Sequence, residues 1–274
     1  MPFCQCPEVR LYYQVQGRGP DLLFISGLNG GTWSWYAQVP FFQEHYRTIV
    51  FDNRGAGRSD QPPGPYRMEQ FAADALCLLD HLDVQQTLVV GMSMGGMIAQ
   101  ALALAAPERV RALVLACTHC GPPERTPPAP GVLEGISQIQ GLTQAQIIEK
   151  DLPFMFSPGF LAGQPEAVEA YRRVQLSAPF QPEFAFYAQL AAIQGFSCCR
   201  RLPDLAVPTL VITGTADVIV PPANARLLAS LLPQAELVEI AGAGHAVNVE
   251  CPEEFNAAVL QFLQKHPRPS KTMP

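Results

Sequence analysis

Short apolar runs alternate with segments of helical periodicity along most of the chain. Alternation over residues 10–16 predicts an antiparallel strand, and apolar runs predict buried strands over residues 22–25, 48–51, 87–90, 112–116, 209–213 and 236–240. Helical spacing predicts helices over residues 68–82, 97–105, 223–232 and 253–265. Cys4 and Cys6 flank Gln5 and fit one further edge strand. Because strands and helices alternate, the sequence predicts a mostly parallel, doubly wound α/β sheet of eight strands.

The alternation stops over residues 121–204. A proline-rich stretch over residues 121–131 indicates a hinge, and helical segments without a clear strand follow it. We therefore expect a core formed by residues 1–120 and 205–274, and a helical cap formed by residues 121–204 that covers the cleft at the carboxyl ends of the strands. Most of the large apolar side chains in the cap must pack the cap itself. Our candidates for an apolar substrate pocket are Trp33, Trp35, Phe154, Phe156, Phe184 and Tyr187.

Composition indicates a compact, water-soluble protein. Hydrophobic residues make up 48% of the 274 residues, and the formal net charge of −6 gives no electrostatic basis for binding nucleic acid. The first residues show no basic segment followed by an apolar core, so we expect no signal peptide, and no apolar run is long enough to predict a membrane span. We therefore expect a cytoplasmic protein, either monomer or homodimer. The prolines of residues 267–274 predict a frayed tail.

Eight cysteines raise the question of disulfides or a metal site. Without a secretory signal we expect reduced thiols, most of them buried as small apolar side chains. Cys117 and Cys120 resemble a redox or metal pair, but the chain has no second ligand pair at zinc spacing. A structural or pocket-lining role is the favoured interpretation of both, and packing is favoured for Cys198 and Cys199. No metal site is predicted.

Ser93 lies in the pattern Gly-x-Ser-x-Gly, between a predicted strand and a predicted helix. A serine on such a sharp turn is held in a strained backbone conformation that points its hydroxyl into a cleft. The glycines at positions 91 and 95 give the turn room. A glycine-rich turn that contains serine by chance is the competing interpretation, but the strand before it and the helix after it favour a nucleophile.

A nucleophilic serine needs a base, and the base needs an acid to hold its tautomer. Among five histidines, His245 follows a strand and a glycine-containing loop, which lets its ring reach a neighbouring strand end. Asp217 follows the penultimate parallel strand and is the favoured acid. Glu124, after the preceding strand, is the weaker alternative. We therefore expect Ser93, His245 and Asp217 to form a catalytic triad.

Together with the serine, histidine and aspartate identified above, the chain resembles the α/β-hydrolase superfamily over nearly its whole length. The resemblance rests on residues 23–31 at the position of the oxyanion loop, the Asp-x-Arg-Gly-x-Gly-x-Ser pattern of residues 52–59, the serine turn, and residues 214–221 followed by Gly244 and His245. It implies an oxyanion hole formed by the backbone N–H groups of Leu28 and Met94, and no cofactor. The chain departs from the family at one position of the oxyanion loop: Ser26 precedes Gly27, where many members have histidine. This difference bears on the rigidity of the loop and on the polarity of the mouth of the cleft.

The predicted function is hydrolysis of small to medium apolar carboxylic esters through an acyl-enzyme, with a small-molecule substrate as partner. The serine turn resembles those of small carboxylesterases and enol-lactone hydrolases. The cap size resembles that of pimeloyl methyl ester esterases, which need a basic cap surface for a carrier protein. Enol-lactone or carbon–carbon bond hydrolysis, and haloperoxidase or perhydrolase chemistry without a cofactor, use the same motifs. A ligand receptor with little turnover is a further alternative.

Charged acyl groups are expected to be poor substrates unless an arginine of the cap turns inward. The candidates are Arg172, Arg173, Arg200 and Arg201, and a solvated face is the favoured interpretation of each pair.

Overall fold

The computed structural model of the protein describes residues 2–267 and contains an eight-stranded sheet. The strands lie in the order β1-β2-β4-β3-β5-β6-β7-β8. The pairings β1–β2 and β2–β4 are antiparallel, and all pairings from β4 to β8 are parallel, which confirms the predicted architecture. The strands are β1 Phe3–Gln5, β2 Arg10–Gln16, β3 Asp21–Ile25, β4 Arg47–Phe51, β5 Thr87–Met92, β6 Val110–Ala116, β7 Thr209–Gly214 and β8 Ala235–Ile240.

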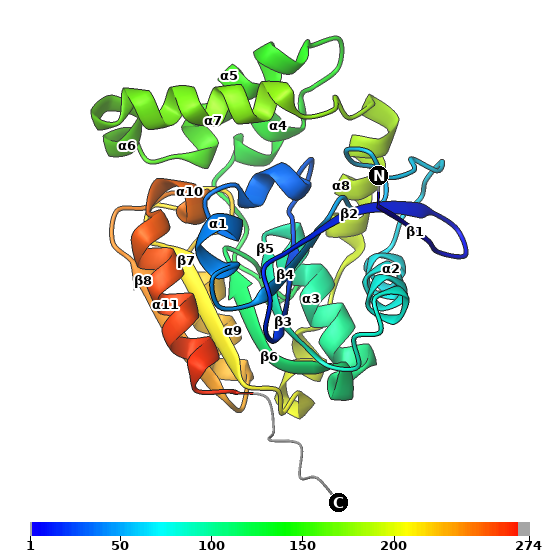
Figure 1. The fold of residues 1–274 in the computed structure, drawn as a ribbon. Helices are drawn as coiled ribbons and strands as arrows, with labels where there is room; N and C mark the ends of the chain where they lie inside the picture. Colours follow the sequence, from blue (N-terminus) through cyan, green and yellow to red (C-terminus); the bar gives the residue numbers. More distant parts are fainter. Residues whose placement is uncertain (1, 268–274) are drawn as a thin grey trace, which may run out of the picture.

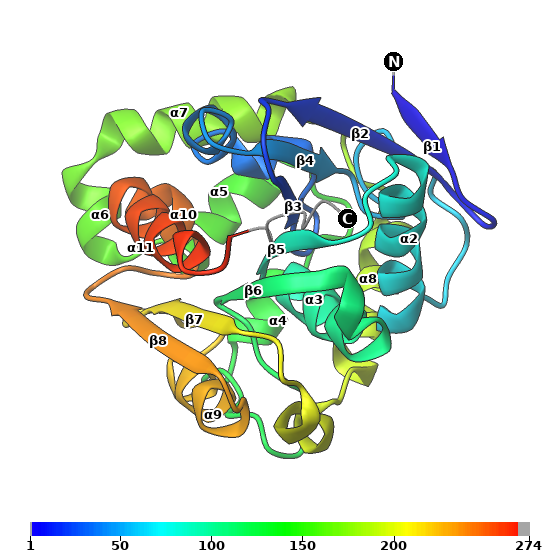
Figure 2. The same cartoon turned by 60° about the horizontal axis from the view of Figure 1, so that its bottom comes forward.

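Helices cover both faces of the sheet (Figures 1 and 2). One face packs against α2 (Met68–His81), α3 (Met94–Ala105) and α9 (Ala223–Leu231). The other packs against α1 (Val39–Phe42) and α11 (Pro252–Gln264). The remaining short elements of the core are η1 Thr32–Trp35, η2 Pro107–Arg109 and α10 Val247–Glu250, and η3 Cys199–Asp204 precedes β7.

Strand β3 shows why the central strands are continuous apolar runs. Leu23 and Ile25 belong to the cluster under α2 and α3, whereas Leu22 and Phe24 belong to the cluster under α1 and α11. Successive side chains of a strand point to opposite faces, so a strand covered by helices on both sides carries apolar residues on both faces. The sheet therefore forms the central layer of the molecule, between two layers of helices.

Five helices lie between β6 and β7: α4 Val132–Ser137, α5 Gln144–Met155, α6 Pro158–Gly163, α7 Pro165–Ser177 and α8 Glu183–Gly195. Residues 117–208 are all described and contain no strand. In Figure 1, α4 to α7 lie above the sheet, at the top of the view, whereas α8 runs down beside it. Ala188 and Ala192 of α8 pack into the same core cluster as α2 and α3. Helix α8 therefore joins the helices above the sheet to the core. We refer to residues 121–204 as the insertion.

Four cysteines form disulfides, which corrects the expectation of reduced thiols. Cys6 is bonded to Cys77, and Cys120 is bonded to Cys199. The Cα atoms of the two pairs lie 6.0 and 4.9 Å apart, within the range that a disulfide spans. Cys120 follows β6 and Cys199 begins η3, so this bond joins the two ends of the insertion. Tertiary proximity, which spacing along the chain does not reveal, brought these thiols together.

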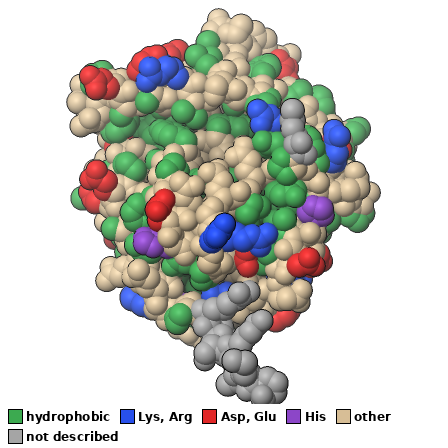
Figure 3. Space-filling view, in the orientation of Figure 1, with side chains coloured by type: hydrophobic (Ala, Val, Ile, Leu, Met, Phe, Trp, Pro, Cys, Tyr) green, Lys and Arg blue, Asp and Glu red, His purple; other side chains and the backbone are tan. Residues whose placement is uncertain are grey.

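On the face shown in Figure 3, basic and acidic side chains are interspersed rather than gathered into a single basic patch. Among residues 2–267, no helix combines the length and the apolar character that crossing a membrane requires. The predicted frayed tail falls almost wholly on residues 268–274, outside the described part of the chain.

Candidate active site

Ser93 stands at the junction between β5 and α3, with φ of 56° and ψ of −120°. A non-glycine residue in such a conformation costs about 1–3 kcal/mol, so its surroundings must hold it there. Its N–H donates to the carbonyl of Ala116 at 2.9 Å, and the Thr118 hydroxyl donates to its carbonyl at 2.8 Å. Strand β6 and the residues after it thus fix the turn, while the Ser93 side chain stays partly exposed.

The two glycines of the turn are required by close backbone contacts. A Cβ atom at Gly95 would lie 2.0 Å from the carbonyl oxygen of Ile25, and one at Gly91 would lie 2.4 Å from the carbonyl oxygen of Gly95. Backbone atoms in a buried sheet cannot move far enough to relieve such overlaps. The sequence pattern therefore has a steric cause in this structure.

His245 joins Ser93 to Asp217. Its Nε2 lies 3.1 Å from Ser93 Oγ, and its Nδ1 lies 2.8 Å from Asp217 Oδ2. The other carboxylate oxygen of Asp217, Oδ1, accepts from the N–H groups of Ile219 and Val220, both at 2.9 Å. The His245 and Asp217 side chains are almost completely buried. Both ring nitrogens of His245 thus have a partner, and Asp217, rather than Glu124, lies against the imidazole.

Glu250 holds the loop that carries His245, a role that sequence reasoning missed. Its Oε2 accepts from the N–H of Gly244 at 2.9 Å and from the N–H of Ser157 at 3.1 Å, and its Oε1 bonds the Ser157 hydroxyl. The Ala246 N–H donates to the carbonyl of Met155 at 2.8 Å. The insertion therefore anchors the histidine loop directly.

The loop after β3 lies against the serine. A Cβ atom at Gly27 would lie 3.1 Å from Ser93 Cβ. The backbone N–H groups of Leu28 and Met94 have no hydrogen-bond acceptor within residues 2–267. Leu28 packs its side chain against Ile147 and Phe186 of the insertion. Leu28 follows Gly27 and Met94 follows Ser93 in the chain, and an oxyanion site needs backbone donors of this kind without partners.

Ser26, where the sequence departs from the family, ties this loop together. Its hydroxyl donates to the carbonyl of Gly31 at 2.8 Å and accepts from the indole N–H of Trp35 at 2.9 Å. Trp35 is 1% exposed and packs on Phe24 in the core. Its assignment as a pocket residue was wrong, because the helical turn of η1 directs its ring into the core and leaves Trp33 outside.

Asp52 and Gln189 brace the same loop from two sides. Asp52 accepts from the N–H groups of Thr32 and Arg58 at 2.7 and 2.9 Å. Burial raises the pKa of Asp52, while those two backbone donors act to lower it. Gln189, on α8, accepts from the N–H of Asn29 at 3.2 Å. In the sequence, Gln189 stands among apolar residues of α8, which is the signal that could have indicated this contact.

Cys117 lies beside the acid. Its sulfur, an Asp217 oxygen and a His245 ring nitrogen all lie within 4.8 Å of one another. Burial, and next the negative charge of Asp217, raise the pKa of the Cys117 thiol well above its usual value, so the sulfur stays protonated. A neutral thiol beside the carboxylate does not compete with imidazole for its charge. The favoured interpretation, a structural role near the cleft, agrees with this position.

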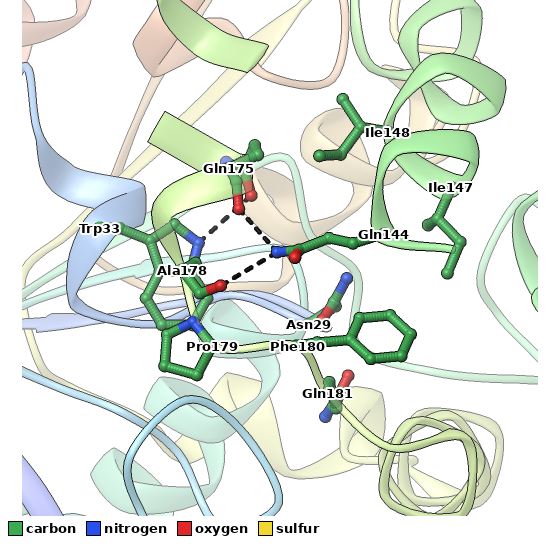
Figure 4. Close-up of a pocket in the computed structure, with 10 residues that line it drawn as sticks. All are labelled: Asn29, Trp33, Gln144, Ile147, Ile148, Gln175, Ala178, Pro179, Phe180 and Gln181. Carbon is green, nitrogen blue, oxygen red and sulfur yellow. Dashed lines mark hydrogen bonds between the residues drawn. The ribbon is translucent and has the colours of Figure 1, made fainter. Parts of the chain in front are cut away.

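A small cavity opens between the core and the insertion (Figure 4), with a volume of about 20 Å³, room for about one water molecule. Its walls carry many side-chain amides. Gln144 donates to the carbonyls of residues 175 and 178 at 2.8 and 3.1 Å, and Trp33 donates to Gln175 at 3.2 Å. Gln181 donates to Gly55 at 2.7 Å, and its buried Oε1 has no partner among the described residues. The lining residues are Asn29, Trp33, Gln144, Ile147, Ile148, Gln175, Ala178, Pro179, Phe180 and Gln181.

Of the six substrate-binding candidates, only Trp33 lines this cavity. Phe156 is buried and packs between Phe160 and Tyr171 inside the insertion. Phe154 packs against Gly135, whereas Phe184 is 52% exposed and Tyr187 is 39% exposed. Phe154 and Phe156 therefore serve the packing of the insertion itself, whereas Phe184 and Tyr187 lie at the surface.

The arginine candidates lie at the surface. Arg172 forms a two-pronged ion pair with Glu149, at 2.6 and 2.9 Å, and Arg200 lies 3.5 Å from Glu124 with its side chain 87% exposed. The solvated-face interpretation holds for these two residues.

The sequence and the fold of this chain are both similar to those of known proteins. A family model described as "alpha/beta hydrolase fold" matches residues 20–134 and 150–252. The chain belongs to the alpha/beta hydrolase fold family. It is 34% identical to 3-oxoadipate enol-lactonase 2 of Acinetobacter baylyi over 269 residues, which cover 94% of each chain.

Two solved structures are similar over almost their full length. A thermophilic esterase from Thermogutta terrifontis, with malate bound, shows 30% identity and a TM-score of 0.83, covering 97% of both chains. The enol-lactonase of Burkholderia xenovorans shows 27% identity and a TM-score of 0.85, covering 96% of this chain and all of that one. Membership of this family, together with such relatives, supports an enzyme of the hydrolase type.

Proposed function

We propose that the protein is a serine-dependent carboxylic ester hydrolase with Ser93 as nucleophile, His245 as base and Asp217 as the acid that orients it. The observation that carries the proposal is the unbroken chain of contacts from Ser93 Oγ to His245 Nε2 at 3.1 Å and from His245 Nδ1 to Asp217 Oδ2 at 2.8 Å. A strained, partly exposed serine beside a buried imidazole fits nucleophilic catalysis better than a structural role.

The reaction follows from this arrangement. His245 Nε2 takes the hydroxyl proton as Ser93 Oγ attacks the ester carbonyl, and Asp217 stabilises the resulting imidazolium. The backbone N–H groups of Leu28 and Met94 receive the negative charge on the carbonyl oxygen. His245 then returns the proton to the leaving alkoxide. Water repeats the sequence on the acyl-enzyme and regenerates the serine.

Fluorophosphonate labelling tests the nucleophile independently of the substrate. A fluorophosphonate should phosphonylate the wild-type protein once, at the peptide that contains Ser93, and should leave Ser93→Ala unlabelled. The matched control is Ser197→Ala, because Ser197 is a surface serine of the insertion. Labelling at another serine, or none in the folded protein, would contradict the proposal.

Small to medium apolar esters are the proposed substrates, and ester chain length tests that choice. Each added methylene that is buried gains about 0.8 kcal/mol, so kcat/KM should rise about three- to fourfold per carbon until the site is full. We expect p-nitrophenyl esters to improve from acetyl to about butyryl or hexanoyl and then to decline. A steady fall from acetyl onward would instead indicate a site limited by Leu28, Met94 and Trp33.

Enol-lactone hydrolysis is the second candidate. It is favoured by the 34% identity to 3-oxoadipate enol-lactonase 2 over 94% of both chains. The same triad opens a cyclic ester by the same steps, and the leaving enolate remains attached to the acyl group. Hydrolysis of an enol-lactone with kcat/KM above that for every open-chain ester of similar size would favour this candidate.

A further inference from the structure

The ring of His119 is approached by two groups that can only donate hydrogen bonds. The backbone N–H of Gly121 donates to His119 Nδ1 at 3.1 Å, and the guanidinium Nη1 of Arg125 lies 3.1 Å from His119 Nε2. A neutral imidazole has one acceptor nitrogen and one N–H, and an imidazolium has no acceptor at all. In every protonation state of the ring, at least one donor therefore faces a donor.

The charge around His119 is also unbalanced. Burial, and next the positive charge of Arg125, lower the pKa of His119 to about 4, so the ring is neutral at pH 7. Arg125 is half-buried, and no carboxylate of residues 2–267 forms a salt bridge with it. Arg54, Arg172 and Arg200, by contrast, all have acidic partners.

His119 lies next to the serine turn. It comes three residues after Ala116, whose carbonyl accepts the Ser93 N–H, and directly after Thr118, whose hydroxyl bonds Ser93. Its own carbonyl accepts from Gln100 of α3 at 3.2 Å. His119 is 4% exposed, and the charge of His245 also acts on it. The pair formed by His119 and Arg125 thus stands at the junction of the serine turn and the hinge of the insertion.

We propose that His119 and Arg125 form a subsite for a carboxylate carried by the substrate, so that the enzyme acts on esters or lactones with a second, anionic end. The inference rests on the proposed function, and it replaces the apolar esters proposed there with esters or lactones that carry a carboxylate. With Nδ1 accepting from Gly121, the neutral ring carries its proton on Nε2 and points it at the same place as the Arg125 guanidinium. The two nitrogens lie 3.1 Å apart, too close for an oxygen between them, so Arg125 must turn its Nη1 away from the ring. A carboxylate that bridges the two groups then accepts from both, which removes the donor–donor contact and neutralises the arginine.

The same arrangement explains why the partner is an anion rather than a neutral polar group. A hydroxyl or amide could satisfy the two donors but would leave the half-buried Arg125 charge unpaired. A carboxylate has two oxygens and accepts from both donors at once. The amide-lined cavity, whose walls carry no arginine or lysine, is a separate place and does not supply this function.

A binding experiment tests the subsite without turnover. Ser93→Ala is labelled with 15N at histidine and titrated with monoethyl adipate or with ethyl hexanoate, which differ only in a carboxylate or a methyl group at the far end. We expect monoethyl adipate to perturb the His119 ring signals and raise its pKa, and ethyl hexanoate to leave both almost unchanged. Arg125→Gln in the same background should abolish the response.

A kinetic experiment locates the subsite relative to the serine. Wild type is compared on the monoethyl esters of succinic, glutaric, adipic and pimelic acids and on the neutral ethyl esters of matching length. For the best diacid, Arg125→Gln should lower the ratio of kcat/KM for the acidic ester to kcat/KM for the neutral one by about 10- to 100-fold, the range for a hydrogen bond to a charged group. Arg125→Lys should retain part of the ratio, and the exposed Arg200→Gln should retain all of it.

The outcomes are distinguishable. Equal ratios in wild type and Arg125→Gln at every length, together with an unshifted His119 ring, would overturn the subsite and show that Arg125 turns to solvent. A ring response without hydrolysis of any ester would leave the subsite standing and refute the proposed reaction. If Arg125→Gln melts early, the ring response of wild-type His119 still decides the question.

Discussion

Replacing Asp217 with asparagine tests the role of each oxygen of the acid. Oδ1 of Asp217 accepts two backbone N–H groups, from Ile219 and Val220, whereas Oδ2 faces His245 Nδ1. In Asp217→Asn the amide oxygen must take the Oδ1 position, because an amide NH2 there would face two donors. The NH2 group then points at His245 and donates to Nδ1. The ring is forced to carry its proton on Nε2, where it cannot accept the proton of Ser93.

The size of the loss follows from these contacts. Flipping the amide to restore the correct tautomer would leave buried donors unsatisfied, at about 1–3 kcal/mol each. A penalty of about 2 kcal/mol for the pair already limits the productive tautomer to about one part in thirty. The variant also loses the negative charge that stabilises the imidazolium. Together these effects should lower kcat by about 10⁴-fold, the size seen for the same change in another serine hydrolase.

The assay is hydrolysis of p-nitrophenyl butyrate by purified wild type and Asp217→Asn, with Asp204→Asn, at an exposed position of η3, as the matched control. Circular dichroism and thermal melting should show the same fold for all three. A loss of less than tenfold in a correctly folded Asp217→Asn would refute the tautomer argument. It would mean that His245 is oriented by something other than this carboxylate.

Three further predictions follow from the same geometry. Ser93→Ala should lower kcat for ester hydrolysis by several orders of magnitude without changing the melting temperature by more than a few degrees, and wild-type rates in the variant would contradict the assignment. Gly95→Ala should lower the free energy of unfolding by about 3 kcal/mol or more, because its Cβ would lie 2.0 Å from the Ile25 carbonyl oxygen. Urea unfolding measures the loss, and Gly163→Ala, whose Cβ would have nothing within 4 Å, is the neutral control. The pKa of His119 in the folded protein is about 4, below the usual 6.5. As pH falls, the unfolded chain therefore takes up a proton on this ring before the folded protein does, so stability should fall as pH drops from about 6.5 to 4. His119→Gln should show a flatter decline over that window, and an unchanged pH profile would show that the ring already titrates normally.

The sheet and the serine turn could be predicted from the sequence because each depends on local patterns. Val89 and Val90 point to opposite faces and are both completely buried, so strand β5 had to carry apolar residues on both faces. The carboxyl ends of parallel strands meet at one edge, and this brought Ser93, Asp217 and His245 within reach of one another from positions far apart in the chain.

Only the tertiary structure decided the contacts made by the insertion and the pairing of the cysteines. Trp33 and Trp35 are two residues apart, yet one lines a cavity and the other fills the core, because the direction of a short helical turn sets each ring. Glu250 and the pair formed by His119 and Arg125 carry no local signal, since their partners come from distant or irregular segments. Local periodicity reports which face of an element is buried, whereas the identity of the atoms it meets depends on how separate elements pack.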